Sequence, residues 1–317
     1  MNDISDAAGI GGTEGQDPRF AEIDLWPTAS ILEALAEAQM SAVAMVRAAI
    51  PELERVIAAA LPRLRAGGRL FYVGAGTSGR IGMQDGVELT PTFGWAPERL
   101  VLLLAGGTGA LFQAAEGAED DEDAARRDIL AHRPGGDDVV LGVAASGNTP
   151  YTAAALRAAR AAGSLTVGMS CNAEGRLLRE AELGIGIVTG AEVIAGSTRL
   201  KAGTAQKAAL NLLSTTLMVR LGHAYRGQMV DMRVVNAKLR RRAARMVRTL
   251  AGGTDDEIRQ ALDAAGGNVK RAVLIRHGMT LEAAEAGLAR HGGDLRATLD
   301  AMGGAMGDAR GAATTGQ

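Results

Sequence analysis

Aromatic residues and net charge are both scarce in this chain of 317 residues. Phe, Trp and Tyr together make up 3% of it, too few for the stacking platforms with which proteins bind single-stranded nucleic acid. The formal net charge is -2, so no large basic field is available to hold a polyanion. Both shortages exclude nucleic acid as a partner.

Metal-binding and disulfide patterns are also missing from the sequence. The single cysteine, Cys171, cannot form an internal disulfide, and the four histidines are scattered without ligand spacing. No run approaches the 18 apolar residues of a transmembrane helix, and the N-terminus has no basic segment followed by an apolar one. We therefore expect a soluble, cytoplasmic protein with no metal and no membrane partner.

Small apolar residues and glycine are plentiful instead. Hydrophobic residues make up 47% of the chain and glycine numbers 43, which suits helices packed on a parallel sheet with many tight turns. From residue 69, strand-like and helical stretches alternate, which predicts a three-layer α/β domain with a mostly parallel sheet. The predicted strands are residues 70–73, 100–104, 138–143, 165–169 and 183–187, and the helices among them 109–116, 120–130 and 152–162.

Helices are predicted on both sides of this domain. Residues 28–65 carry apolar residues at helical spacing, interrupted by Pro51, and further helices are expected at 201–221 and 235–250. Thr254 followed by three acids is a good helix start, and short helices at 255–265, 268–276 and 280–291 predict a small separate domain. The predicted organisation is a mobile N-terminus (1–20), N-terminal helices (21–58), the α/β domain (59–225), a connecting helix (226–250), a three-helix domain (251–305) and a disordered tail (306–317).

Two of the predicted strands end in glycine-rich turns that carry hydroxyl groups. Phosphate needs several donors at once, and backbone N–H groups at a turn or helix start supply them without bulk. Because the carboxyl ends of parallel strands meet at one edge of a sheet, the two turns predict a phosphate cradle and a phosphosugar enzyme. The residues of this cradle are Gly76, Thr77 and Ser78 in the first turn and Ser146, Gly147 and Thr149 in the second.

The glycines of the first turn allow other interpretations. Gly74, Gly76 and Gly79 also fit the spacing of dinucleotide-binding folds, but such a site needs an acid at a strand end about twenty residues on. Residues 89–97 offer none, so a nucleotide-dependent oxidoreductase is the weakest alternative. Tight turns without a ligand remain possible for either loop singly.

Charged residues near two further segments could carry chemistry. Ser197 or Thr198 can cap the helix that follows, and Lys201 places a cation at its start, where the helix dipole disfavours it. Such a cation indicates an anionic ligand nearby, or simply a surface position. Glu88 lies between apolar residues that favour a protonated carboxyl and so suit acid–base work, while Glu119 lies in an acidic stretch. On local sequence alone, structural roles for both glutamates stay open.

Together these segments resemble the N-acetylmuramic acid 6-phosphate etherases, which have the sugar isomerase (SIS) fold. The resemblance covers roughly residues 23–247 almost continuously, and the small C-terminal helical domain also fits the family's layout. So many blocks in order are far more specific than any one of them. The matching blocks lie at residues 74–80, 91–94, 105–107, 116–120, 144–147, 149–151, 170–172, 196–207, 211–215 and 229–231.

The resemblance implies a lyase of cell-wall amino-sugar recycling that needs no cofactor. It implies cleavage of the D-lactyl ether at C3 of the open-chain sugar by elimination and then hydration, yielding N-acetylglucosamine 6-phosphate and D-lactate. Two glutamates act as acid and base in the family, and they match Glu88 and Glu119 here. We assign Glu88 to protonation of the leaving lactate and Glu119 to the C2 proton, which the aldehyde acidifies, and the reverse assignment of the two glutamates stays open.

The resemblance also implies a binding site and an assembly. The phosphate would lie on Ser78 and the second turn, with Ser197 in the matching block at 196–207 and Lys201 approaching the sugar, and a homodimer would complete the site near its interface. Two departures matter: Asn148 stands where the family usually has Arg, which weakens or reorganises the phosphate contacts, and Val87 and Leu89 make the surroundings of Glu88 more apolar. A non-catalytic phosphosugar-binding regulator and a sugar-phosphate isomerase remain as alternatives within the fold.

Overall fold

The computed structural model describes residues 12–113 and 115–303. The chain divides into two compact units, Met1–Val87 with Pro97–Ser214 and Glu88–Ala96 with Thr215–Gln317, and each is described by itself. Most of the N-terminus predicted as mobile, residues 1–11, and all of the predicted tail, residues 306–317, lie outside the described residues.

A five-stranded parallel sheet forms the centre of the first unit, as the alternating pattern predicts. The order is β2-β1-β3-β4-β5, and every predicted strand is present with its ends shifted by one residue at most. Gly74 at the end of β1 pairs with Val143 near the end of β3, so the segments that follow these two strands start side by side. The strands are β1 (Leu70–Gly74), β2 (Leu100–Leu104), β3 (Val139–Ala144), β4 (Leu165–Ser170) and β5 (Leu183–Gly186).

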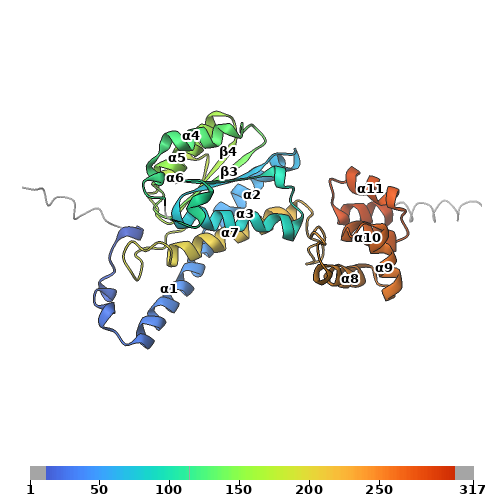
Figure 1. Ribbon diagram of the computed structural model, residues 1–317, viewed down its shortest axis with the longest axis horizontal. Helices are drawn as coiled ribbons and strands as arrows, with labels where there is room; N and C mark the ends of the chain where they lie inside the picture. The colour runs from blue at the N-terminus through green and yellow to red at the C-terminus, as the bar shows by residue number, and fades with distance from the viewer. Residues whose placement is uncertain (1–11, 114, 304–317) are drawn as a thin grey trace, which may run out of the picture. The chain divides into compact units, whose positions relative to one another are not determined.

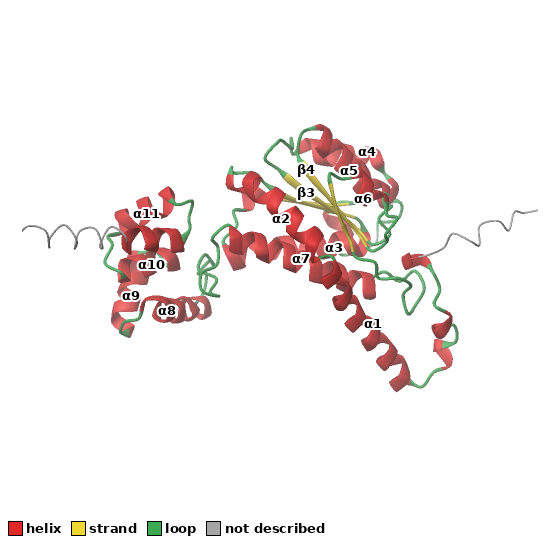
Figure 2. Ribbon diagram, turned by 180° about the vertical axis from the view of Figure 1, so that it is seen from behind, coloured by secondary structure: helices red, strands yellow, loops and turns green. Residues whose placement is uncertain are grey.

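Helices cover both faces of this sheet, which confirms the three-layer fold. Figures 1 and 2 show α4, α5 and α6 on one face and α2, α3 and α7 on the other. Tyr151, Ala155 and Ile129 pack against Phe71 and Val101 in the core of the first face. The helices are α1 (Thr28–Ala48), α2 (Ile50–Arg65), α3 (Gly76–Phe93), α4 (Glu122–Ala131), α5 (Pro150–Ala161), α6 (Arg176–Glu180) and α7 (Lys201–Arg220).

Glycine explains two departures of the first unit from the predicted helices. The helix predicted at 109–116 is wrong for the residues described there: one 3-10 turn, η5 (Thr108–Leu111), forms between Gly107 and Gly117, which both have positive φ. Conversely, α3 forms although it is glycine-rich. A Cβ on Gly79 would lie 2.7 Å from the backbone of Gly74, so the glycine that weakens the local helix pattern lets α3 pack directly on β1.

Helix α1 exposes much of its apolar surface. Leu32, Met40 and Val43 are 61%, 66% and 53% exposed and lie on one stripe at helical spacing. Among the described residues it is the one helix long and apolar enough, by length and composition, to cross a membrane. Glu33 and Glu37 interrupt its sequence and would be costly in hydrocarbon. A protein surface is therefore the better match for this stripe.

Among its described residues, the second unit contains four helices near the C-terminal end of the chain. Thr254 caps α9 in a capping box with Glu257, as its sequence predicts, and Asn268 and Thr280 cap the next two helices. An apolar core joins the four helices. They are α8 (Ala237–Ala251), α9 (Asp255–Ala264), α10 (Val269–Arg276) and α11 (Leu281–Arg290).

Candidate active site

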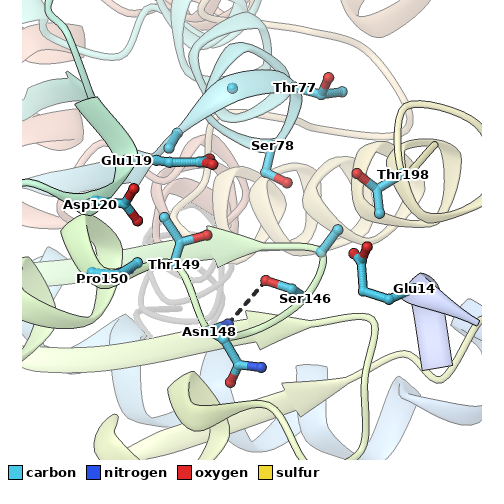
Figure 3. A pocket seen from close by; sticks show the side chains of 13 residues that line it. Glu14, Thr77, Ser78, Glu119, Asp120, Ser146, Asn148, Thr149, Pro150 and Thr198 are labelled. Atoms are coloured by element: carbon cyan, nitrogen blue, oxygen red, sulfur yellow. Dashed lines mark hydrogen bonds between the residues drawn. The ribbon is translucent and has the colours of Figure 1, made fainter. Parts of the chain in front are cut away.

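A cavity of about 330 Å³ lies at the carboxyl edge of the sheet, where β1 and β3 end (Figure 3). Its volume suits a small ligand such as a phosphorylated sugar. Three further segments complete its wall, at Glu14, at Glu119 with Asp120, and at Thr198. The lining residues are Glu14, Ala75, Gly76, Thr77, Ser78, Glu119, Asp120, Ala145, Ser146, Asn148, Thr149, Pro150 and Thr198.

The first glycine-rich turn forms the start of α3 at this cavity. Gly76 has φ +52°, and Thr77 and Ser78 follow in the first helical turn, where unpaired N–H groups and the helix dipole attract an anion. The Ser78 hydroxyl donates to Oε1 of Gln206 on α7 at 2.9 Å, and both side chains are buried. This hydrogen bond fixes the orientation of Ser78 at the cavity wall.

The second turn leads into α5 and brings a second helix N-terminus to the cavity. Ser146 accepts a hydrogen bond from the Asn148 backbone N–H at 3.1 Å, and Thr149 stands at the N-cap of α5. Gly147 itself is not part of the lining: it packs beneath, where a Cβ would lie 2.3 Å from the Ser170 hydroxyl. Two helix starts and several hydroxyls therefore converge on one space, the arrangement that phosphate binding requires.

A buried carboxylate shapes the start of α7. Glu192 is 1% exposed and accepts hydrogen bonds from the backbone N–H groups of Lys201 at 2.9 Å and Ala202 at 2.8 Å. It fills the capping role predicted for Ser197 or Thr198. The Glu192 carboxylate thus supplies negative charge at the start of α7, while the Lys201 ammonium donates to the Ala191 carbonyl at 2.6 Å.

The sequence of this chain is similar to those of several known proteins. Residues 52–160 match the family model of the glucokinase regulatory protein N-terminal SIS domain. The N-acetylmuramic acid 6-phosphate etherase of Deinococcus radiodurans is 51% identical over 288 residues, which covers 90% of this chain and 94% of that protein. The N-acetylmuramic acid 6-phosphate etherase of Streptomyces coelicolor is 46% identical, covering 91% and 93%.

The chain belongs to the N-acetylmuramic acid 6-phosphate etherase family. Among solved structures, a phosphoheptose isomerase from Francisella tularensis matches 61% of this chain and 97% of that chain, with 17% identity and a TM-score of 0.45.

Most residues that the etherase resemblance predicts for the site do meet at the cavity. Ser197, Lys201, Gly147 and Glu88 are not among its lining residues. Asn148 lines it, but its side-chain oxygen accepts from the Arg176 backbone N–H at 3.0 Å and so serves the start of α6. The predicted residues that the cavity brings together are Gly76, Thr77, Ser78, Glu119, Ser146, Asn148 and Thr149.

The two predicted catalytic glutamates of this etherase-family chain lie in different surroundings. Glu119 belongs to the short helix η6 (Ala118–Asp120) and extends into the cavity opposite the second turn (Figure 3). Glu88 lies on α3 with its side chain exposed, next to exposed Val87 and buried Leu89. Among the described residues the Glu88 side chain is therefore exposed, although both of its sequence neighbours are apolar.

Three polar or charged residues that line the cavity were not predicted as site residues from the sequence: Glu14, Asp120 and Thr198. Asp120 and Thr198 are the sequence neighbours of Glu119 and Ser197, which were predicted, so their positions in the sequence could have indicated a place in the site. No sequence pattern indicated Glu14, because it belongs to η1 (Gly12–Glu14), within the segment predicted to be mobile.

Cys171 packs with Ala145 and Ala202 and is not among the lining residues of the cavity. Burial, and after it the charge of Glu192, raises the pKa of the Cys171 thiol to about 12, which leaves it protonated and a poor nucleophile. Within the described ranges, no group of three or more His, Cys, Asp or Glu side chains is arranged to hold a metal ion. The carboxylates that line the cavity are those of Glu14, Glu119 and Asp120.

Proposed function

We propose that this chain cleaves the D-lactyl ether of N-acetylmuramic acid 6-phosphate, yielding N-acetylglucosamine 6-phosphate and D-lactate. It is a carbon–oxygen lyase of cell-wall amino-sugar metabolism, acting in the cytoplasm. One observation carries the proposal beyond family membership: Glu119 extends into the same cavity as two helix N-termini and their hydroxyl groups.

The phosphate end of the sugar binds at the two turns. The N–H groups at the starts of α3 and α5 face a common space, and Ser78, Ser146 and Thr149 add hydroxyl donors. Anchoring the phosphate holds the open-chain sugar in one orientation, so that its reacting carbons lie near Glu119.

The reaction then needs one base and one acid. The C1 aldehyde acidifies the C2 hydrogen, and Glu119 removes it as a proton. The electron pair forms the C2–C3 double bond while the C3–O bond breaks, and Glu88 gives a proton to the leaving lactate oxygen. Water, activated by Glu88, adds at C3, and the proton held by Glu119 returns to C2. Atoms and electrons balance without an oxidant or reductant.

A second copy of the chain supplies the acid. Glu88 is exposed, so its carboxyl group is accessible to a second copy of the chain in a homodimer. The exposed stripe of α1, formed by Leu32, Met40 and Val43, provides apolar surface for such an interface. Figure 1 shows α1 extending away from the sheet domain, where a second copy can reach it.

The test is release of D-lactate from N-acetylmuramic acid 6-phosphate by the purified protein. We expect release by the native chain and a loss of about 100-fold or more in kcat for Glu119→Gln, the scale of acid–base catalysis. Glu116→Gln is the matched control, because Glu116 is exposed in the same stretch and does not line the cavity. Equal activity of Glu119→Gln and Glu116→Gln would contradict the role of Glu119.

A phosphosugar-binding regulator is the second candidate, favoured by the match to the glucokinase regulatory protein SIS domain. It predicts binding of the sugar phosphate with no D-lactate release. The same assay therefore separates the two functions.

A further inference from the structure

Glu14 reaches the cavity from a segment that is remote in the sequence and held in place by buried contacts. Thr13, which is 0% exposed, donates its backbone N–H to Oδ1 of Asn172 at 3.1 Å, and Asn172 Nδ2 donates to the Thr13 hydroxyl at 3.2 Å. Gln16 forms a backbone bridge with Glu192. These contacts fix the segment on both sides of Glu14.

The same contacts connect Glu14 to the second turn. Asn172 Nδ2 also donates to the Ser146 carbonyl at 3.3 Å, so one amide holds both the N-terminal segment and the phosphate-binding turn. Gly12 lies so close to Asn172 that an added Cβ would overlap its side-chain oxygen, which requires glycine there. The position of the Glu14 carboxylate relative to Ser146 is therefore built into the fold.

The carboxylate itself is aimed at the ligand space. Figure 3 shows Glu14 beside Ser146 and Thr198, away from Glu119 at the other end of the cavity. A Cβ on Gly196 would lie 3.3 Å from Glu14 Oε2, so glycine leaves room for the carboxylate at this wall. Within the described part of the chain, no hydrogen bond or ion pair is found for the Glu14 side chain.

An anion next to a phosphate cradle needs a donor between the two charges. Direct contact with phosphate would be repulsive, whereas a sugar hydroxyl can donate to the carboxylate and separate it from the phosphate. We propose that Glu14 is a substrate-binding residue that accepts a hydrogen bond from a sugar hydroxyl on the phosphate side of the reacting carbons. It distinguishes a phosphorylated polyol from phosphate alone. This inference rests on the proposed phosphosugar site.

Binding of two probes to the native chain and to Glu14→Gln tests the assignment. The dissociation constants of N-acetylglucosamine 6-phosphate and of inorganic phosphate are measured by calorimetry, without any lactate assay. Glu14→Gln should raise the dissociation constant of N-acetylglucosamine 6-phosphate about tenfold, which corresponds to the difference between a charge-assisted and a neutral hydrogen bond. Inorganic phosphate should bind at least as tightly as before, because a repelling charge has been removed.

Two controls keep the result interpretable. Glu22→Gln changes an exposed carboxylate of the same N-terminal region outside the cavity lining and should alter neither constant. Thr13→Val keeps the carboxylate but removes the hydroxyl that Asn172 binds, and should weaken the sugar phosphate less than Glu14→Gln does. Thermal unfolding of each variant verifies that the fold is retained.

The outcomes separate this inference from the proposed function. An unchanged affinity of Glu14→Gln for the sugar phosphate would overturn the assignment of Glu14. An equal loss of affinity for the sugar phosphate and for inorganic phosphate would also overturn it, because such a loss indicates a merely structural role. In the lactate assay we expect KM to rise about tenfold with kcat little changed. A native chain that binds both probes but releases no lactate would contradict the etherase proposal alone.

Discussion

At the scale of single residues, Gly147 determines whether the second turn can form. Its φ is +72°, and a Cβ would lie 2.3 Å from the Ser170 hydroxyl and 2.6 Å from Gly175 Cα. Gly147→Ala should destabilise the fold by about 2–4 kcal/mol through backbone strain and this overlap. It should also weaken inorganic phosphate binding.

Gly109→Ala is the matched control, because open space surrounds Gly109 and its φ is not positive. Urea unfolding and phosphate titration of both variants provide the measurement. A Gly147→Ala protein as stable as Gly109→Ala would show that the turn tolerates a side chain.

Cys171 gives a second prediction at this scale. Burial raises the pKa of its thiol to about 12, so the folded protein should react very slowly with iodoacetamide at pH 8. Unfolding in urea should restore full reactivity, which mass spectrometry of the alkylated chain would detect. Rapid labelling of the folded protein would mean that the segment around Cys171 opens readily.

Some residues of the candidate site could be predicted from the sequence, and others could not. The hydroxyls of Ser78, Ser146 and Thr149 were predictable, because each follows a strand that the apolar pattern identifies. Glu14 was not, since its place depends on contacts with Asn172, which is 159 positions from Thr13 in the sequence. Glu192 likewise took over the capping role predicted for its neighbours in the chain. The catalytic roles of Glu88 and Glu119 remain predictions.

At the scale of elements, an ion pair joins the starts of β1 and β3. Asp138 accepts hydrogen bonds from the Arg69 backbone N–H at 2.9 Å, the Arg69 guanidinium at 2.6 Å and the Gly135 N–H at 2.9 Å. Burial alone would raise the pKa of Asp138, but these hydrogen bonds outweigh it and hold the pKa below its ordinary value. The carboxylate therefore stabilises the folded chain in its charged form.

The sign of the pH dependence follows from this lowered pKa. The contribution of Asp138 is fully present above the pKa of an unfolded Asp, about 4, and is lost as the pH falls through the folded-state value. Asp138→Asn should cost about 1–3 kcal/mol at pH 7, and the difference from the native chain should shrink below pH 4. Urea unfolding at pH 7 and pH 3 measures both. A difference that is the same at both pH values would contradict the charge-dependent account.

Elements were predictable where the apolar pattern is strong and unbroken. All five strands and the helices α9 to α11 follow from such patterns and from caps such as Thr254. Helix α3 was less visible because its glycines lower helix propensity while allowing close packing on β1, which only the assembled sheet reveals. The helix predicted at 109–116 is wrong for a different reason, since Gly107 and Gly117 on either side of the stretch adopt positive φ, which a helix does not allow.

At the scale of the whole molecule, the proposed shared site needs a homodimer, and the exposed stripe of α1 is its proposed interface. Met40→Asp places a charge in that stripe and should convert the dimer to a monomer with little lactate-releasing activity. Gln260→Asp adds the same charge at an exposed position of α9 and should change neither the oligomeric state nor the lactate-releasing activity. Light scattering with a parallel activity assay measures both variants. A fully active monomer would exclude an essential second copy.

The most direct test of the shared site combines two inactive variants in one dimer. The Glu88→Gln chain and the Glu119→Gln chain are each expressed alone and are also coexpressed. D-lactate release from N-acetylmuramic acid 6-phosphate is then compared between the two single variants and the coexpressed mixture. If each site takes Glu119 from one copy and Glu88 from its partner, half of the sites in a mixed dimer regain both glutamates. Random pairing should then restore about a quarter of the native activity. A mixture as inactive as its two parents, or a native chain that releases no lactate, would contradict the account.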